Sequence, residues 1–209
     1  MKIDRLESLI YRIPLSTPME AASHGVMREF DMVVVRLRDS DGAQGCGYTV
    51  LHAGHGASVK SIINNVFAQT VLAEDPRRIE WNWSRMWRSH HYSGRGGPVS
   101  FAIAAVDAAL WDLRGRSLGE PLWRLLGGHK PEVRAYAGNI DLNLPKEKLL
   151  EGVSRSLAAG YKSIKMRLGK PRLREDVERV AAVRDLIGPD IELMTDANEA
   201  WRTDQAMHA

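Results

Sequence analysis

Two basic residues late in the chain have the types and the spacing to hold an anion. Lys165 and Arg167 lie two residues apart in the segment 163–168 (SIKMRL). In a β-strand both would project from one face, while Ile164 and Met166 would take the other. Parallel sheets are normally covered on both faces, so two neighbouring cations are costly there unless an anion lies beside them. The pair therefore predicts contact with a negatively charged group.

The next apolar segment supplies an acidic side chain for the same region. Residues 191–196 (IELMTD) end in Asp196, and Asn198 follows two residues later. Functional groups of βα folds gather at the carboxyl ends of strands, so Asp196 should lie beside Lys165 and Arg167. This arrangement suits a metal ligand next to a site for an anionic, oxygen-rich substrate. An ion pair between Lys165 and Asp196 that closes one end of the sheet accounts for the spacing equally well.

The second half of the chain alternates between strand and helix signals, with a repeat of about 30 residues that indicates parallel βα units. The expected strands are 133–137, 163–168 and 191–196, and the expected helices are 145–159, 172–187 and one that opens at Thr203. The apolar stripe of the middle helix consists of Leu173, Val177, Val180 and Ile187. A closed (β/α)8 barrel needs eight units, so these form either a small open sheet or the front part of a longer protein. The last helix begins shortly before Ala209, which favours the second alternative.

The first half predicts an α+β unit, in which a strand meander precedes helices. Its strands are expected at 9–13, 32–38 and 43–50, with a hairpin turn at 39–42 and a surface loop at 16–29. Residues 57–126 have helical spacing, and 99–113 are apolar on almost every face, which predicts a helix buried on all sides. The pattern changes after Gly127-Gly128. We therefore expect an α+β domain at 1–130 and a parallel α/β domain at 131–209.

Composition indicates an ordinary globular protein. The chain has 209 residues, 44% of them hydrophobic and 26% charged, which is enough apolar material for a core. The net charge of +3 is spread along the chain, so we expect no nucleic-acid partner. A single cysteine, Cys46, excludes an internal disulfide and a cysteine-based zinc cluster. The charged start MKIDR does not fit a signal peptide, and no apolar run reaches the ~20 residues of a membrane helix. We therefore expect a soluble, cytoplasmic protein without a membrane partner.

Several longer stretches resemble a known superfamily. The runs 97–128 (GPVSFAIAAVDAALWDLRGRSLGEPLWRLLGG), 159–169 (AGYKSIKMRLG) and 193–201 (LMTDANEAW) are similar to the enolase superfamily, in its mandelate racemase-like subgroup. The stretches 44–56 (QGCGYTVLHAGHG), 91–97 (HYSGRGG) and 135–144 (AYAGNIDLNL) most closely resemble acid-sugar dehydratases that act on galactarate and L-talarate.

This resemblance implies an α+β capping domain over a (β/α)8 TIM-type barrel that binds Mg²⁺. Such enzymes remove the proton α to a carboxylate, and the metal stabilises the resulting enediolate. Lys165 matches the residue that helps to polarise the substrate carboxylate, Arg167 the usual base, Asp196 the first of three acidic metal ligands, and Asn198 the amide after it. The other ligands and a His–Asp pair lie on later strands of the family fold. The implied substrate is an acid-sugar carboxylate, and the implied assembly is a homo-oligomer.

Arg167 departs from the family pattern, in which a second lysine acts as the base. An arginine keeps its proton below a pH of about 12, so Arg167 cannot simply take that role. It can instead clamp a carboxylate and leave proton removal to the histidine of a later strand. Dehydration is then favoured over racemisation or epimerisation, which needs a base on each face. Because one ligand does not make a metal site, we expect this chain alone to be inactive, whether it is a fragment of a Mg²⁺-dependent hydro-lyase or a non-catalytic remnant.

Histidines in the first half are candidate substrate contacts. His52 and His55 lie in a glycine-rich loop, where the resemblance places the second capping loop above the barrel mouth. With the loop around Thr17, Met19 and His24, it would select the distal end of the substrate. The two histidines could also hold a metal, although a third ligand is missing, or simply be solvated. Arg95 is a candidate partner for a substrate carboxylate, with a solvated loop as the alternative.

Overall fold

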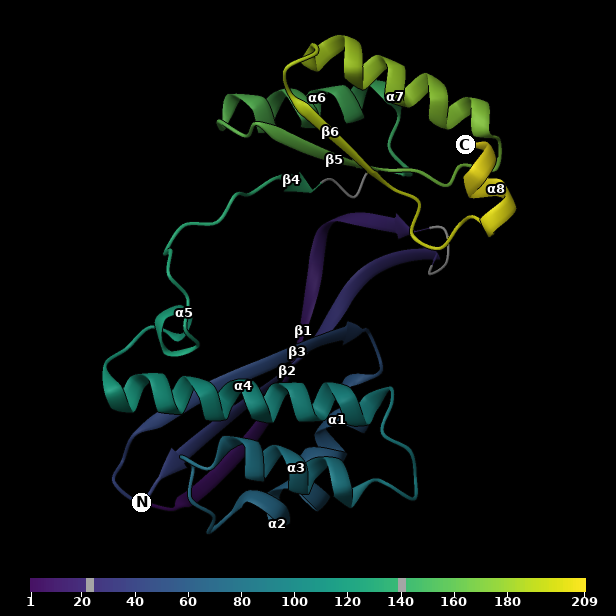
Figure 1. The fold of residues 1–209 in the computed structure, drawn as a ribbon. Helices are drawn as coiled ribbons and strands as arrows, with labels where there is room; N and C mark the ends of the chain where they lie inside the picture. The colour runs from purple at the N-terminus through teal and green to yellow at the C-terminus, as the bar shows by residue number, and fades with distance from the viewer. Residues whose placement is uncertain (22–24, 139–141) are drawn as a thin grey trace. The chain divides into compact units, whose positions relative to one another are not determined.

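The chain folds into two compact units, shown in Figure 1. The computed structural model describes residues 1–21, 25–138 and 142–209. Contacts group residues 1–14 with 29–131 in the first unit, and residues 15–28 with 132–209 in the second. The division after Pro131 lies one residue from the predicted domain boundary, whereas the sequence did not suggest that 15–28 would group with the second half. No helix in the described ranges combines the length and the apolar character that a membrane span requires.

The meander predicted at the start of the chain is present as an antiparallel sheet. Strands β1 (Ile3–Ala21), β2 (Gly25–Asp39) and β3 (Gln44–His52) are hydrogen-bonded in the order β1-β2-β3. In β2 and β3, Val33 pairs with Thr49 and Val35 with Gly47. The surface loop predicted at 16–29 is wrong, because β1 continues to Ala21 and β2 begins at Gly25. Hydrogen bonding between paired strands satisfies the backbone even where the side chains are polar, and composition alone does not reveal this pairing.

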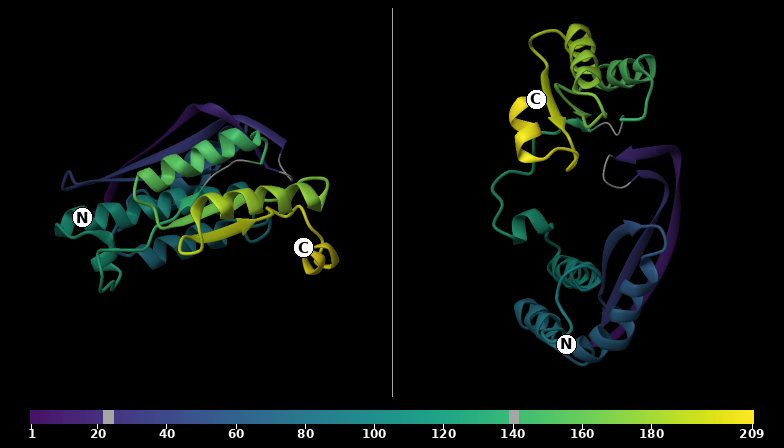
Figure 2. Two further views of the ribbon diagram at one scale, coloured as in Figure 1. Left: turned by 90° about the horizontal axis from the view of Figure 1, so that it is seen from above. Right: turned by 90° about the vertical axis from the view of Figure 1, so that its right-hand side faces the viewer.

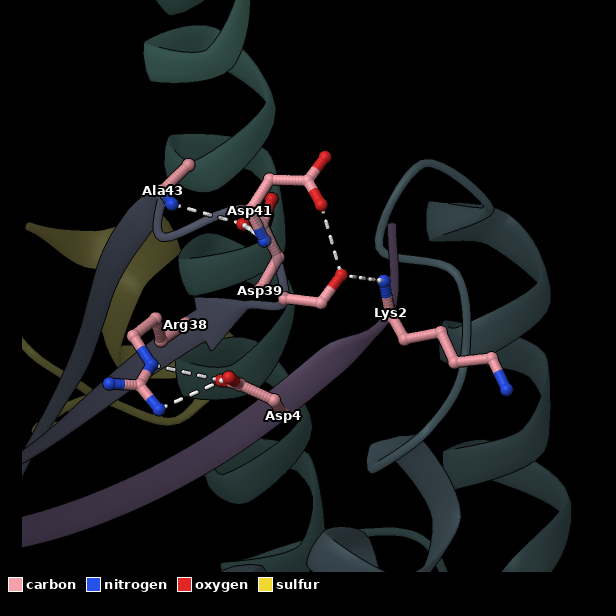
Figure 3. A network of polar contacts seen from close by, with 7 residues as sticks. Lys2, Asp4, Arg38, Asp39, Asp41 and Ala43 are labelled. Atoms are coloured by element: carbon pink, nitrogen blue, oxygen red, sulfur yellow. Dashed lines mark hydrogen bonds and ion pairs between the residues drawn. The ribbon is translucent and has the colours of Figure 1, made fainter.

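Asp39 closes the hairpin turn between β2 and β3 (Figure 3). Its Oδ1 accepts hydrogen bonds from the backbone N–H groups of Asp41, at 3.0 Å, and Ala43, at 2.9 Å. Gly42 takes the left-handed conformation of the turn, with φ of +91°. Beside the turn, Arg38 donates two hydrogen bonds to the carboxylate of Asp4. The turn predicted at 39–42 is thus confirmed, and it sets the register of the sheet that leads to His52.

Helices follow the sheet along the chain. They are α1 (Gly56–Ile62), the π-helical turn η1 (Ile63–Phe67), α2 (Ala68–Val71), α3 (Ile79–Ser89), α4 (Pro98–Leu118) and α5 (Leu122–Leu125). Two of them, α1 and α4, contact β3. The long helix α4 begins with a proline at its first position and ends at Gly119 in the left-handed conformation, as such helices commonly do. It packs along β3. Within this unit α4 is not buried on all sides as predicted, since Phe101, Ala104 and Ala108 form an exposed stripe.

Asp107, near the middle of α4, is expected to destabilise the folded protein near neutral pH. Its carboxyl is half-buried, and this burial together with the charge of Glu80 raises the pKa of Asp107 from 3.8 to about 6. Between the ordinary pKa of 3.8 and the raised pKa of about 6, the folded chain binds more protons than the unfolded chain. The folded protein therefore loses stability as the pH rises through this range. Asp107→Asn stays neutral and should increase the free energy of unfolding above about pH 7 by about 1 kcal/mol, because partial exposure screens the charge.

Thermal unfolding of the two proteins above pH 7 and below about pH 4 measures this difference, which should disappear at the lower pH. The matched control is Asp112→Asn on the same helix. Asp112 accepts hydrogen bonds from the Cys46 amide and from Arg116, both at 2.8 Å, so its loss should destabilise the protein near neutral pH. An Asp107→Asn protein that melts below wild type above pH 7 would contradict the assignment.

The second unit contains the predicted parallel βα repeats. Its elements are β4 (Ala137–Gly138), α6 (Lys146–Ala158), β5 (Ser163–Arg167), α7 (Leu173–Ile187), β6 (Glu192–Asp196) and α8 (Thr203–His208). The strands pair in parallel in the order β4-β5-β6. The strand predicted at 133–137 forms only at its end. Of the stripe predicted on α7, Leu173 and Val177 are exposed, and the helix buries Asp176 and Arg179 instead.

Helices α6 and α7 lie side by side over one face of this sheet, as Figures 1 and 2 show. The shared core contains Leu149 and Val153 from α6, Ile164 and Met166 from β5, and Val183 and Ile187 from α7. Because side chains alternate along a strand, burial of Ile164 and Met166 turns Lys165 and Arg167 to the opposite face. The core thereby positions the two cations that the sequence singled out.

Candidate active site

Lys165 and Asp196 form a direct ion pair at the carboxyl end of the parallel sheet. The Lys165 Nζ lies 2.6 Å from the Asp196 Oδ2, and the two side chains are 27% and 32% exposed. In the register of β5 and β6, Arg167 is opposite Asp196. Two cations and one carboxylate therefore meet at the strand ends, as predicted. The ion pair that was the alternative explanation for the spacing is present, so any ligand of Asp196 must share the carboxylate with Lys165.

Two contacts keep the Asp196 carboxylate ionised. The Lys165 ammonium group is the principal cause that holds the pKa of Asp196 below its ordinary value, and the backbone N–H of Asn198 is the next. That N–H donates to the Asp196 Oδ1 at 2.9 Å. Burial of the carboxyl acts in the opposite direction, and the charge of Arg167 makes a smaller contribution that also lowers the pKa of Asp196. At neutral pH the site therefore presents a carboxylate anion between positive charges.

Asn198 belongs to a tightly turned loop after β6. Asn198 and Glu199 both take positive φ values, of +46° and +63°, and the Ala200 N–H closes the turn on the Ala197 carbonyl at 3.0 Å. Asparagine tolerates this conformation better than most residues, whereas it is uncommon for glutamate. The loop keeps the Asn198 backbone against Asp196, so the predicted substrate-binding residue lies within the same constellation.

Asp176 and Arg179 fix the end of β5, and the sequence interpretation missed both. The Asp176 Oδ2 accepts hydrogen bonds from the Gly169 and Lys170 N–H groups, each at 2.9 Å. The Arg179 Nη1 donates to the Arg167 carbonyl at 2.7 Å and to the Asp176 Oδ1 at 3.2 Å. Both residues are buried on α7, and their hydrogen bonds hold the backbone at Arg167 and just after it. The signal was an acid and a base three residues apart on the core face of a helix that follows the cationic strand.

The remaining candidates lie outside this constellation. His52, the last residue of β3, and His55, which directly precedes α1, are both exposed in the first unit. Arg95 stacks on Trp87, with its guanidinium carbon 4.8 Å from the ring centre, and its Nε donates to the Trp87 carbonyl at 3.2 Å. These contacts hold Arg95 against α3. His24 lies outside the described residues.

Asp196 is a chemically suitable magnesium ligand but does not form a site by itself. Magnesium prefers hard oxygen ligands, and the Asp196 carboxylate is such a group, although Lys165 and the Asn198 N–H already contact it. Among residues 1–21, 25–138 and 142–209 there is no group of three His, Cys, Asp or Glu side chains that could hold a metal. The described residues therefore supply one ligand of the several that magnesium normally takes.

The fold and the site together define the class: an α+β unit followed by a unit of parallel βα repeats, with charged groups at the strand ends. The chain belongs to the mandelate racemase/muconate lactonizing enzyme family of the enolase superfamily. The family's N-terminal domain matches residues 7–127, and the enolase C-terminal domain-like family matches residues 148–209. The resemblance inferred from the three motifs is confirmed.

Individual relatives have several activities. The chain is 45% identical, over 99% of its length, to a 3,6-anhydro-alpha-L-galactonate cycloisomerase from Streptomyces coelicolor, and it covers 57% of that protein. It is 31% identical, over 98% of its length, to the L-talarate/galactarate dehydratase of Salmonella typhimurium and covers 53% of it. A crystal structure of a racemase from Streptomyces coelicolor with bound magnesium superposes with a TM-score of 0.96 at 45% identity, covering 99% of this chain and 58% of that one. The chain thus spans a little over half the length of these relatives.

Proposed function

We propose that this chain forms the cap and the first barrel strands of a Mg²⁺-dependent acid-sugar dehydratase. The observation that carries the proposal is the Lys165–Asp196 pair at the carboxyl end of β5 and β6, with Arg167 opposite Asp196. This arrangement combines a hard oxygen ligand with two cations, and it suits a substrate carboxylate. Dehydratases among the relatives support the reaction class.

The reaction breaks two bonds of the sugar acid. A base removes the proton on the carbon next to the carboxylate, and the electron pair of that C–H bond becomes part of a double bond. The hydroxyl on the following carbon then leaves with a proton as water, and the resulting enol converts to a 2-keto acid. Negative charge accumulates on the carboxylate oxygens during the first step, so the site must stabilise that charge.

Lys165 and Arg167 supply charge and orientation in this scheme. Arg167 stays protonated at working pH, and its planar guanidinium suits two parallel hydrogen bonds to a carboxylate. Lys165, held by Asp196, is a point charge about 7 Å along the same strand face, by the usual rise per residue. We assign proton removal to a group supplied by the rest of the barrel, because neither arginine nor an ion-paired lysine is suited to it.

Asp196 and the two imidazoles of the first unit complete the proposal. Asp196 would be one ligand of Mg²⁺, and a bound magnesium ion would neutralise part of the charge that develops on the substrate carboxylate. His52 and His55, with His24, would contact the distal part of the sugar acid, and Arg95 would be a partner for a substrate carboxylate. The enzyme would act as a homo-oligomer on a small carboxylate in the cytoplasm.

A cycloisomerase is the second candidate, and the 45% identity to such an enzyme favours it. In a 3,6-anhydro sugar acid, the ring oxygen on C3 takes the place of the leaving hydroxyl. Removal of the α-proton and departure of that oxygen would open the ring without loss of water. The same charged groups serve both reactions, so the product mass separates them.

The test uses a fusion of this chain to the part of the Streptomyces cycloisomerase that the chain does not match. The fusion is incubated with aldaric, aldonic and 3,6-anhydro aldonic acids in the presence of Mg²⁺, and the molecular masses of the products are measured by mass spectrometry. A dehydratase gives a 2-keto product lighter by one water, and a cycloisomerase gives a product of unchanged mass. A folded, magnesium-loaded fusion that exchanges no α-proton of any acid would refute the proposal.

The isolated chain is expected to bind magnesium weakly. Asp196 is the single candidate carboxylate ligand among the described residues, and hard oxygen sites of useful affinity normally combine several ligands. Calorimetric titration should therefore give a Kd of about a millimolar or above, as is typical of weak oxygen sites. Micromolar affinity that disappears in Asp196→Ala would show that the chain assembles a complete site and contradict this expectation.

A further inference from the structure

A buried carboxylate in the first unit lies beneath the loop that carries His52 and His55. Asp31 is on β2, on the same face as Val33, Val35 and Leu37, and is almost completely buried. A charge at such a position is costly unless hydrogen bonds and an opposite charge compensate it. The groups that compensate the buried charge of Asp31 therefore indicate the role of this residue.

The partners of Asp31 come mainly from the backbone of the loop. Its Oδ2 accepts hydrogen bonds from the Gly54 N–H, at 2.8 Å, and from the Gly56 N–H, at 3.0 Å. Its Oδ1 accepts one from the Arg12 Nε, at 3.1 Å. The Gly56 amide is the largest cause that lowers the pKa of Asp31. The Arg12 side chain is 55% exposed, so solvent screens that ion pair and the two amide bonds carry more weight.

Glycine at both loop positions fits this arrangement. Gly54 has a φ of +90°, which other residues rarely adopt. A Cβ on Gly56 would come within 3.0 Å of the Asp31 Cβ and 3.1 Å of its Oδ2. The loop therefore follows the carboxylate closely, and a side chain at Gly56 would push the two apart.

The loop presents both imidazoles to one hollow. A cavity of about 430 Å³ is lined by His52 and His55 together with Phe30, Pro98 and Phe101. The His52 ring meets Phe30 edge-on, with 6.2 Å between ring centres. The His55 N–H donates to the His52 carbonyl at 3.2 Å, so a hydrogen-bonded turn joins the two histidines.

We propose that Asp31 is a positioning residue for substrate recognition: its carboxylate ties the loop 51–56 in the shape that places His52 and His55 on this hollow. The alternative is a purely structural buried carboxylate, whose loss would weaken the whole unit equally. The proposal rests on the proposed function only for the identity of the ligand as a hydroxylated sugar acid. The tie itself is a property of the chain alone.

The first experiment measures the tie in the 209-residue chain by amide hydrogen exchange and imidazole NMR signals. In Asp31→Asn, exchange at Gly54 and Gly56 should rise by about tenfold or more relative to the other amides of the unit. The ring signals of His52 and His55 should shift, while those of His90 and His91 stay in place. Asp4→Asn, which breaks an exposed ion pair with Arg38 in the same sheet, is the matched control and should change none of these signals.

Gly56→Ala keeps the charge of Asp31 and displaces the loop, so it provides an independent variant if Asp31→Asn does not fold. It should produce the same local exchange and the same imidazole shifts. Uniform loss of protection across the unit, or unchanged loop signals in either folded variant, would overturn the tie.

The second experiment measures selectivity in the fusion. Asp31→Asn should change the ratio of kcat/KM between two sugar acids that differ at the distal end, mainly through KM, by about tenfold. Equal losses for both acids, carried by kcat, would overturn the role in recognition. If the unmodified fusion turns over no acid, the proposed function fails, and the loop exchange and imidazole shifts then decide the positioning role on their own.

Discussion

Replacing Lys165 by methionine in the fusion is expected to lower kcat/KM by about a thousandfold, the scale for removing one preorganised charge from a developing oxyanion. Methionine retains most of the length of the lysine stem and removes the charge that lies 2.6 Å from Asp196. The loss should appear in kcat rather than KM, because the charge on the substrate oxygens grows towards the transition state.

Arg167→Met should have a smaller effect of a different kind. Because arginine positions the substrate and does not transfer a proton, exchange of the substrate α-hydrogen with solvent deuterium should persist at about a hundredth of its normal rate. Binding should weaken as well, since a bidentate contact to the carboxylate is lost. Measuring exchange and turnover on the same samples separates proton removal from the later steps.

Lys162→Met is the control for both variants. Lys162 is an exposed lysine that precedes β5, at the opposite end of the strand from Arg167, so its loss should leave turnover unchanged. If Arg167→Met abolishes exchange completely while substrate binding and magnesium affinity persist, the arginine belongs to the proton path. Arg167 would then transfer a proton and would not only position the substrate.

The charged face of β5 could be predicted because side chains along a strand point alternately to its two faces. Lys165 and Arg167 alternate with Ile164 and Met166, and burial of the apolar pair leaves one orientation for the cations. The position of Asp196 beside these cations could be predicted as well, because parallel strands bring their carboxyl ends to one edge of the sheet. The local boundaries of α6, β5, α7 and β6 agree with the predicted ranges to within two residues.

The supporting residues could not be predicted, because they act through backbone atoms distant in sequence. Asp31 reads as an ordinary member of a strand, and its partners Gly54 and Gly56 lie more than 20 residues away. Asp176 and Arg179 lie three residues apart on α7, and hydropathy alone does not show that the helix turns them inward to hold the backbone at the end of β5. Hydropathy describes side chains, whereas these contacts satisfy main-chain donors and acceptors.

The same limit applies to two glycines of β3, which determine how closely the sheet and α4 approach. Gly45 and Gly47 lie on the buried face of the strand, two residues apart. A Cβ on Gly47 would overlap the Ala105 carbonyl oxygen and the Ala109 amide nitrogen, and a Cβ on Gly45 would overlap the Ala109 carbonyl oxygen. Glycine in a strand indicates a close approach only when the opposing element is known.

Gly47→Ala is therefore expected to destabilise the first unit by at least about 3 kcal/mol, the upper end for overpacking, because the overlapping atoms belong to the backbone and cannot rotate away. Since the free energy of unfolding of a whole domain is only about 5–15 kcal/mol, a large part of the variant should be unfolded or aggregated at about 37 °C. Urea unfolding followed by tryptophan fluorescence measures the change, since Trp83, Trp87 and Trp111 pack against this core.

Gly96→Ala is the matched control for this experiment. Gly96 has no heavy atom within 4 Å of the position that a Cβ would take, and its φ lies outside the left-handed region. The control should unfold at the same urea concentration as wild type, within the few tenths of a kcal/mol typical of exposed sites. If Gly47→Ala matched that behaviour, α4 would have room to move away from β3, and the close packing of helix on strand would not be what holds the first unit together.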